Sequence, residues 1–100
     1  MRKVKHIVVL RFKQGTTESQ IEGVFDQLLD ISESIPGIED YVAGPNNSPE
    51  GLSQGFTHAL IMTFTDAAAR DGYLSHPEHV KFTEGALPLV ESVAVVDFEL

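Results

Sequence analysis

The N-terminal part of the chain alternates between apolar and polar residues. Five residues spaced two apart form one largely apolar face, namely Val4, His6, Val8, Leu10 and Phe12. Ile7 and Val9 make the centre of the opposite face apolar as well. A period of two is typical of a β-strand, so we expect a strand over residues 4–12 that Gln14-Gly15 brings to an end.

A helical period follows this strand. Thr17 and Gln20 have the spacing of a capping box, in which each side chain accepts a hydrogen bond from the other residue's backbone. Apolar residues then recur three and four positions apart, at Ile21, Val24, Phe25, Leu28, Leu29 and Ile35. This spacing predicts an amphipathic helix that ends at Pro36-Gly37.

Two strands and a long loop are expected in the middle of the chain. Residues 38–43 have a weak strand pattern, whereas residues 56–65 alternate strongly. The loop over residues 44–55 is rich in Gly, Pro, Asn and Ser. Within it, Ser48-Pro49-Glu50 combines a capping residue with a following proline, which predicts a single helical turn.

The C-terminal part is predicted to hold two short helices and a final strand. Asp66 can cap a helix that runs as far as Leu74. His76 precedes Pro77 and is therefore pushed out of helical geometry, and Pro77 can start the second helix. The last strand is expected over residues 93–100.

This order of elements, β-α-β-β-α-β, predicts a ferredoxin-like α+β fold with an antiparallel four-stranded sheet. Right-handed crossovers place the first and third strands side by side and both helices on one sheet face. Ile7, Val9, Ala59 and Ile61 then lie on the uncovered face. Because a monomer would expose this apolar surface, we expect a homodimer that packs through the open sheet face.

Composition limits the function classes. A chain of 100 residues is too short for two stable cores, so residues 1–100 form one domain. The absence of cysteine excludes disulfides, thiol chemistry and cysteine-based zinc sites. The net charge of -8 disfavours partners such as nucleic acid or an anionic membrane. No signal peptide or membrane span is evident, which predicts a soluble cytoplasmic protein.

The candidate chemistry is concentrated in histidines. His6 and His58 lie on the predicted strand faces that look toward the helices, and Tyr73, His76 and His79 come from the helical segment above them. These side chains are expected to converge on a small-molecule pocket between sheet and helices. The alternative for each single histidine is a buried ring that is hydrogen-bonded to backbone or water.

Asp97 interrupts an otherwise apolar strand and therefore needs a charged or donating partner. We expect that partner to be His79, because a carboxylate on one ring nitrogen makes the other nitrogen a better base. Two alternatives stay open at this point. Asp97 lies at an exposed strand end, or it pairs with a lysine of the first strand.

Other chemistries have weaker signals. His76 and His79 have a metal-ligand spacing, but Pro77 breaks the helical register that would aim both rings at one ion. There is no nucleophile elbow, phosphate loop or dinucleotide fingerprint. We therefore expect neither a metal nor an organic cofactor.

Several segments together resemble the stress-responsive A/B barrel (Dabb) domain family, over nearly the whole chain. They are Lys5-His6-Ile7, Ser48-Pro49-Glu50-Gly51-Leu52, Thr57-His58-Ala59, Tyr73-x-x-His76-Pro77-x-His79 and Val96-Asp97-Phe98. The resemblance implies a dimeric α+β barrel with a ferredoxin-like protomer. The biochemical role of most members is undefined, and plant members include stress-induced proteins.

One characterised member of that family is a cofactor-free polyketide cyclase of the aldol type. The resemblance implies that His79 acts as the catalytic base, that Tyr73 stabilises the oxyanion and that Asp97 supports the base. The residues expected to contact a small hydrophobic or dicarbonyl ligand are His6, Val8, Leu10, Phe25, Leu28, His58, Leu60, His76 and Val90. Leu28 and Val90 replace bulky aromatics of the cyclase, which implies a reshaped tunnel.

Three functions stay open at the level of sequence. The first is a ligand-binding, stress-associated Dabb dimer, and the second is a cofactor-free cyclase or isomerase that acts on a β-dicarbonyl compound. A monooxygenase of the same barrel architecture is an outside possibility, because fold alone does not determine function.

Overall fold

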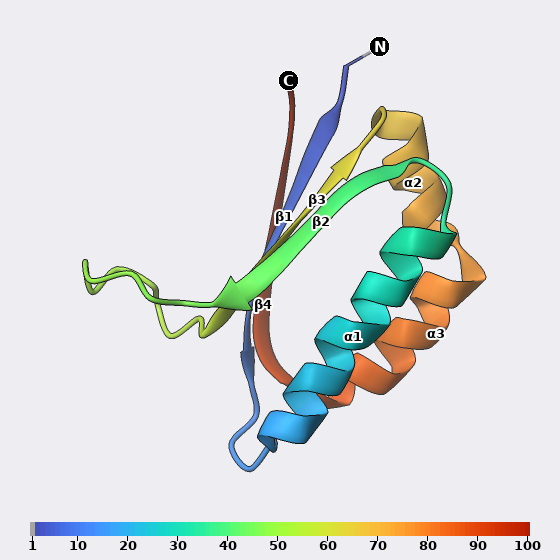
Figure 1. Ribbon diagram of the computed structural model, residues 1–100. Helices are drawn as coiled ribbons and strands as arrows, with labels where there is room; N and C mark the ends of the chain where they lie inside the picture. Colours follow the sequence, from blue (N-terminus) through green and yellow to red (C-terminus); the bar gives the residue numbers. More distant parts are fainter. Residues whose placement is uncertain (1) are drawn as a thin grey trace.

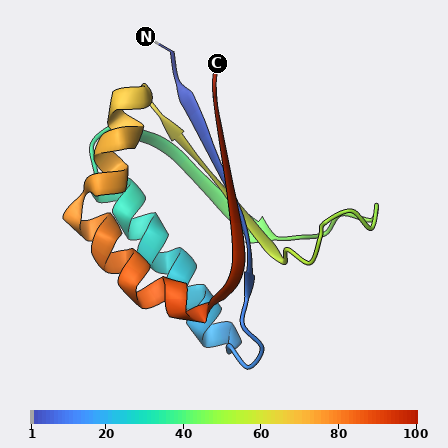
Figure 2. The same ribbon diagram turned by 180° about the vertical axis from the view of Figure 1, so that it is seen from behind.

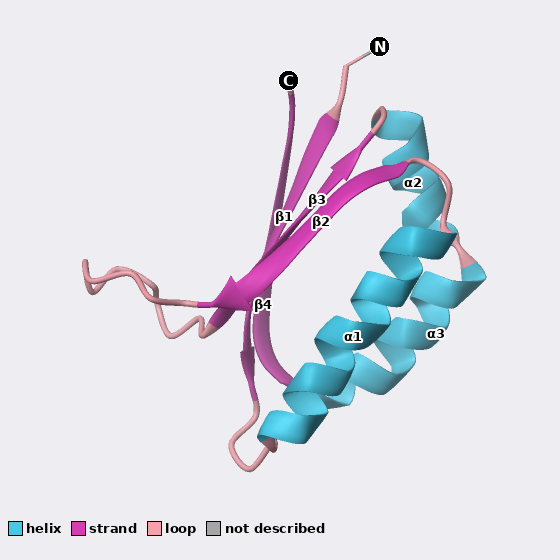
Figure 3. Cartoon of the chain, in the orientation of Figure 1, coloured by secondary structure: helices cyan, strands magenta, loops and turns pink. Residues whose placement is uncertain are grey.

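The computed structural model describes residues 2–100 and has a ferredoxin-like α+β architecture (Figures 1 and 3). The elements in chain order are β1 (Val4–Phe12), α1 (Glu18–Ser34), β2 (Ile38–Pro45), β3 (His58–Phe64), α2 (Ala67–Ser75), α3 (Pro77–Ala86), a 3-10 turn (Leu87–Leu89) and β4 (Val90–Glu99). The predicted fold class is therefore confirmed, and the predicted second and third helices follow each other directly as α2 and α3.

The four strands form one antiparallel sheet in the order β2-β3-β1-β4. β1 lies in the centre, where His6 is opposite Met62 of β3 on one side and Asp97 of β4 on the other. All three helices lie on one side of this sheet (Figure 2). Residues of β1 with even numbers, together with their partners on β3 and β4, therefore face the helices.

The main core lies between the sheet and the helices. Val4, Met62 and Phe64 are completely buried on the covered face of the sheet. α1 packs Val24, Leu28 and the capping residue Ile35 of its predicted stripe against them, together with Ile31. Leu29 was predicted for the same stripe but is exposed, so the prediction is wrong at that position. The same apolar period that predicts the helix therefore also determines which of its faces covers the sheet.

Local side-chain hydrogen bonds mark the helix starts where the sequence predicts them. Thr17 and Gln20 form the full capping box, with N···O distances of 3.1 and 2.9 Å. Asp66 accepts a hydrogen bond from Ala69 N at 2.8 Å and caps α2. At the next corner, His76 ends α2 and caps α3, while Pro77 occupies the first turn of α3.

The segment between β2 and β3 differs from its prediction. No helical turn forms at Ser48–Glu50, so that expectation is wrong. Asn46 Oδ1 instead accepts a hydrogen bond from Ser48 N at 3.0 Å. Such a local bond between a side chain and the backbone favours a bend over a helical turn. Figure 1 shows this loop projecting from the sheet on the side opposite the helices.

The second face of the sheet carries no helix. Ile7, Val9, Ala59 and Ile61 lie on it half-buried, as the strand pattern predicts. Neighbouring strands add three strongly exposed apolar side chains to the same face, namely Val42, Val96 and Phe98. The folded chain thus presents a broad apolar surface over all four strands.

Within residues 2–100, none of the helices has both the length and the apolar character that crossing a membrane requires.

Candidate functional site

A cavity of about 320 Å³ lies between the sheet and the helices. Its walls are mostly apolar and include Val8, Leu10, Phe25, Leu28, Leu60 and Val90, which the sequence predicts as ligand contacts. Five polar residues belong to its lining, namely His6, Tyr73, His79, Thr83 and Asp97. The cavity thus combines a polar group of residues with an otherwise apolar wall.

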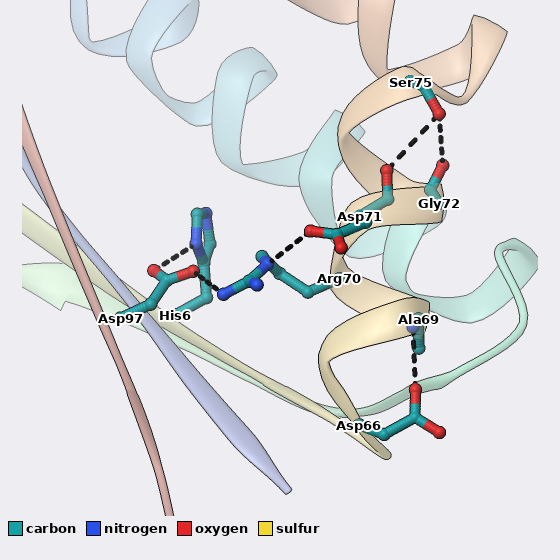
Figure 4. A network of polar contacts seen from close by, with 8 residues as sticks. All are labelled: His6, Asp66, Ala69, Arg70, Asp71, Gly72, Ser75 and Asp97. Carbon is teal, nitrogen blue, oxygen red and sulfur yellow. Dashed lines mark hydrogen bonds and ion pairs between the residues drawn. The ribbon is translucent and has the colours of Figure 1, made fainter.

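His6 and Asp97 form the shortest polar contact of this lining. His6 Nδ1 donates to Asp97 Oδ1 at 2.7 Å, and the His6 side chain is 8% exposed (Figure 4). A carboxylate can only accept, so this bond places the proton of a neutral imidazole on Nδ1 and leaves Nε2 unprotonated. His6 Nε2 is thus the ring nitrogen that can accept a hydrogen bond.

The prediction that Asp97 pairs with His79 is wrong. Asp97 lies directly opposite His6 in the antiparallel register, whereas His79 comes from α3 in the helix layer. The two alternatives fail as well, because the Asp97 side chain is only 19% exposed and no lysine contacts it within the described chain. Its position next to His6 follows from the β1–β4 pairing.

Arg70 is a partner of Asp97 that sequence reasoning missed. Its Nη1 donates to Asp97 Oδ2 at 3.0 Å, and its Nε donates to Asp71 Oδ1 at 2.9 Å (Figure 4). These bonds raise the pKa of Arg70, with Asp71 as the larger contributor, so the guanidinium stays charged. The sequence contains one signal for this role of Arg70. It precedes Tyr73 by three residues, so the two side chains lie on the same face of the helix.

A backbone carbonyl group fixes the tautomer of His79. Its Nδ1 donates to the Leu74 carbonyl oxygen at 3.2 Å, which leaves Nε2 as the unprotonated nitrogen. Burial lowers the pKa of His79 below its usual value of 6.5; the Leu74 hydrogen bond opposes this shift and His6 adds to it. His79 is therefore a neutral imidazole at neutral pH.

Tyr73 lies beside His79 with its ring centroid 4.3 Å from the imidazole centroid. The residue is 3% exposed. Burial, with a smaller contribution from Tyr41, raises the pKa of Tyr73 well above its usual value. Its hydroxyl therefore keeps its proton and is available to donate it in a hydrogen bond.

His58 and His76 lie outside the cavity lining, so the expected convergence of four imidazoles is wrong for these two. The His58 ring stacks on Phe25 at 5.5 Å and meets the edge of Phe12 at 5.4 Å, while its Nδ1 contacts Thr57 Oγ1. His76 Nδ1 accepts from Glu78 N at 3.1 Å and caps α3. Their local partners explain both positions.

Metal ligation is not supported by the arrangement of side chains. Across residues 2–100, no three His, Cys, Asp or Glu side chains are grouped closely enough to hold an ion. The polar lining thus offers two imidazole rings and the hydroxyls of Tyr73 and Thr83 within a small, mostly apolar cavity.

Comparison with known proteins places this geometry in a family. A profile of the family described as "Stress responsive A/B Barrel Domain" matches residues 4–100. The chain belongs to the Dabb family. The predicted resemblance is therefore confirmed, and the histidine-lined cavity described above is that of a Dabb protein.

Relatives of this Dabb protein include enzymes. It is 30% identical over 95 residues to olivetolic acid cyclase from Cannabis sativa, covering 95% of this chain and 94% of the cyclase. A hydroxynitrile lyase from Passiflora edulis has a TM-score of 0.92 at 25% identity, covering 98% and 93% of the two chains. A cyclase and a lyase are thus among the proteins that this chain resembles.

A third similar protein is known by its structure alone. A dimeric ferredoxin-like protein of unknown function from Jannaschia sp. has a TM-score of 0.88 at 26% identity. The alignment covers 98% of this chain and 99% of that protein. The Dabb fold is thus shared by enzymes and by proteins whose role is undefined.

Proposed function

We propose that this Dabb protein binds a small, mostly apolar molecule that has a carbonyl or enol group at one end. The observation that carries the proposal is the grouping of His6, Tyr73 and His79 on the lining of an otherwise apolar cavity. The Tyr73 hydroxyl can donate to a carbonyl oxygen, and either imidazole can accept from an enol. The family description makes a stress-associated role part of this proposal.

The dimensions of the cavity support a small ligand. Pockets for small molecules range from about 300 to about 1,000 Å³, so 320 Å³ lies at the lower end of that range. Leu28 and Val90 belong to the apolar wall, where they offer branched aliphatic surface rather than aromatic rings. A short alkyl chain fits this environment better than a polycyclic ligand.

A second candidate function is cofactor-free proton transfer, and the bond from His79 to Leu74 favours it. With Nδ1 held by a carbonyl, His79 Nε2 can remove a proton from a carbon that lies between two carbonyl groups. The electron pair of the broken C–H bond moves onto the carbonyl oxygen, where the Tyr73 hydroxyl donates to it. The resulting enolate can then attack a second carbonyl carbon, as an aldol-type cyclisation requires.

Homodimerisation is the third part of the proposal. The uncovered face bears exposed Val42, Val96 and Phe98, and a second copy that packs sheet to sheet would remove them from water. The similar Jannaschia protein is described as dimeric. The cavity lies on the other side of the sheet, so dimerisation through this face leaves it free.

Ligand binding and proton transfer can be separated with one probe, ethyl 3-oxohexanoate, which has a dicarbonyl head and a short alkyl tail. Backbone NMR spectra should show shifts at cavity residues such as Val8 and Tyr73. In deuterium oxide, the protein should accelerate exchange at the carbon between the two carbonyls. His79→Gln should keep binding but slow the catalysed exchange at least about 100-fold.

His76→Asn is the matched control, because it removes a nearby imidazole outside the cavity and keeps a good helix cap. Exchange by this variant should equal that of the wild type. Binding without accelerated exchange would overturn the catalytic candidate only. The absence of shifts at cavity residues, with a folded spectrum, would overturn the binding proposal as well.

A further inference from the structure

Arg70 connects the helix layer to the edge of the sheet beside the cavity. It belongs to α2, and its guanidinium reaches Asp97 on β4 while also holding Asp71 of its own helix. Figure 4 shows the guanidinium directed toward one oxygen of Asp97, while the other oxygen is bonded to His6. The Arg70 side chain is 24% exposed, so this ion pair is only partly screened by solvent.

Asp97 distributes its two oxygens between two donors. Oδ1 accepts from His6 and Oδ2 accepts from Arg70. The carboxylate borders both the cavity and a hollow on the outer surface, whereas Arg70 borders the outer hollow only. Arg70 therefore acts on the cavity through Asp97 and does not itself contact a bound ligand.

The charges around His6 balance without a charge on its ring. Within residues 2–100, Asp97 from β4 is the one carboxylate paired with it, and the Arg70 guanidinium on α2 compensates that carboxylate. Tyr73 of α2 and His79 of α3 are the other titratable groups near the ring, and both are neutral at neutral pH. Without Arg70, the Asp97 charge would favour a positively charged imidazole instead.

We infer that Arg70 is a positioning residue of the cavity: by balancing Asp97, it keeps His6 neutral, with Nδ1–H bound to Asp97 and Nε2 free to accept from a ligand. The inference deepens the proposed function and concerns the same cavity. It also explains why an arginine of α2 is tied to the sheet edge.

The test measures the protonation of His6 directly. Nitrogen-15 NMR of the imidazole distinguishes a neutral ring with one protonated nitrogen from a ring in which both are protonated, and His6→Gln assigns the signals. The wild type should show the neutral form with its proton on Nδ1 at about pH 7.5. Arg70→Met should raise the ratio of charged to neutral His6 about tenfold or more.

Three further variants make the result specific. Arg70→Gln keeps a donor for Asp97 without its charge and should behave like Arg70→Met, which also covers the case that the methionine variant does not fold. Arg70→Lys should restore most of the neutral form. Asp71→Asn removes the other partner of Arg70 and should leave His6 unchanged, because the bond to Asp97 remains.

An unchanged neutral His6 in folded Arg70→Met or Arg70→Gln would overturn the inference, and so would a doubly protonated ring in the wild type. The measurement needs no ligand. A failure of the binding experiment with ethyl 3-oxohexanoate therefore leaves this result interpretable, and the two proposals can fail separately.

Discussion

The two imidazoles of the cavity obtain the same tautomer from different partners. His6 is held by a carboxylate and His79 by the backbone carbonyl of Leu74. A carboxylate carries a full charge that must be compensated, which Arg70 does. A carbonyl carries no net charge, so His79 needs no further partner and its pKa is lowered by burial. This difference makes His79 the better candidate for the base.

The lowered pKa of His79 predicts a dependence of stability on pH. Above the usual value of 6.5, the ring is neutral in the folded and the unfolded chain, and its contribution is fully present. As the pH falls below that value, the unfolded chain binds a proton that the folded chain resists, so the free energy of unfolding decreases. Thermal denaturation of His79→Gln should show a weaker loss of Tm than the wild type between about pH 7 and about pH 5.

His76→Asn serves as the reference for this titration, since it removes a histidine outside the cavity lining. Its pH profile should follow that of the wild type. If His79→Gln and the wild type lose Tm equally over this range, burial does not disfavour the charged form of His79.

At the level of elements, the corner between α2 and α3 builds the polar end of the cavity. His76 ends one helix and begins the next, and Pro77 prevents them from merging into one. The corner brings Tyr73 from α2 and His79 from α3 to a ring distance of 4.3 Å. The position of α2 on the sheet therefore determines whether Tyr73 and His79 lie side by side.

Gly37 is one point at which the position of α2 is fixed. Its φ angle is +92°, and a Cβ atom there would lie 2.6 Å from Ala69 Cβ on α2. Gly37→Ala should lower the free energy of unfolding by at least about 1 kcal/mol, because it combines left-handed strain with a close contact. Urea denaturation monitored by circular dichroism measures the change.

Gly23→Ala is the opposite control on α1. That position is helical, and nothing lies within 4 Å of the added Cβ. Alanine should therefore stabilise the protein by about 0.5–1 kcal/mol through its higher helix propensity. Equal effects of both substitutions would argue that the Gly37–Ala69 contact does not constrain α2.

On the scale of the whole molecule, the sheet separates two surfaces with different chemistry. The covered face contributes His6 and Asp97 to the cavity, and the uncovered face carries the exposed Val42, Val96 and Phe98. Residues of both kinds alternate along β4, where Asp97 lies between Val96 and Phe98. Alternate residues of β4 thus face the proposed site, and the residues between them face the proposed dimer interface.

A charge on the uncovered face should separate the two copies. Val96 is 62% exposed and lies opposite Ile7 near the centre of that face. Val96→Asp should raise the dimer dissociation constant at least about 100-fold, because burying an unpaired carboxylate costs several kcal/mol. Light scattering after size exclusion, at several protein concentrations, measures the mass.

Leu29→Asp adds the same charge at an exposed position on α1, in the helix layer, and should leave the dimer intact. A monomeric wild type at micromolar concentration would contradict the proposed dimer. A dimer that persists in Val96→Asp would place the interface elsewhere.

Much of the fold could be predicted because its determinants are local. The alternation over Val4–Phe12 and the capping box at Thr17 each depend on residues within a few positions of one another. The loop was less predictable, since Ser48-Pro49-Glu50 fits either a helical turn or a series of bends. In the structure, Asn46 Oδ1 accepts a hydrogen bond from Ser48 N, which stabilises the bends.

The sequence predicted some members of the candidate site correctly, but it did not predict which side chains pair with one another. The strand period alone places His6 toward the helices, and the corner at Pro77 brings Tyr73 and His79 above it. The sequence does not say how β4 aligns with β1, however, and a shift of two residues would give His6 another neighbour. His58 was expected in the cavity for the same strand period, but its neighbours Phe12 and Phe25 enclose its ring.

The sequence by itself thus determined the order of elements, the two faces of the sheet and the residue types that reach the cavity, because periodicity and capping act over short distances along the chain. Only the tertiary structure decided that Asp97 binds His6 and Arg70 rather than His79. Those partners come from β1 and α2, and they meet only after the sheet register and the helix layer have formed.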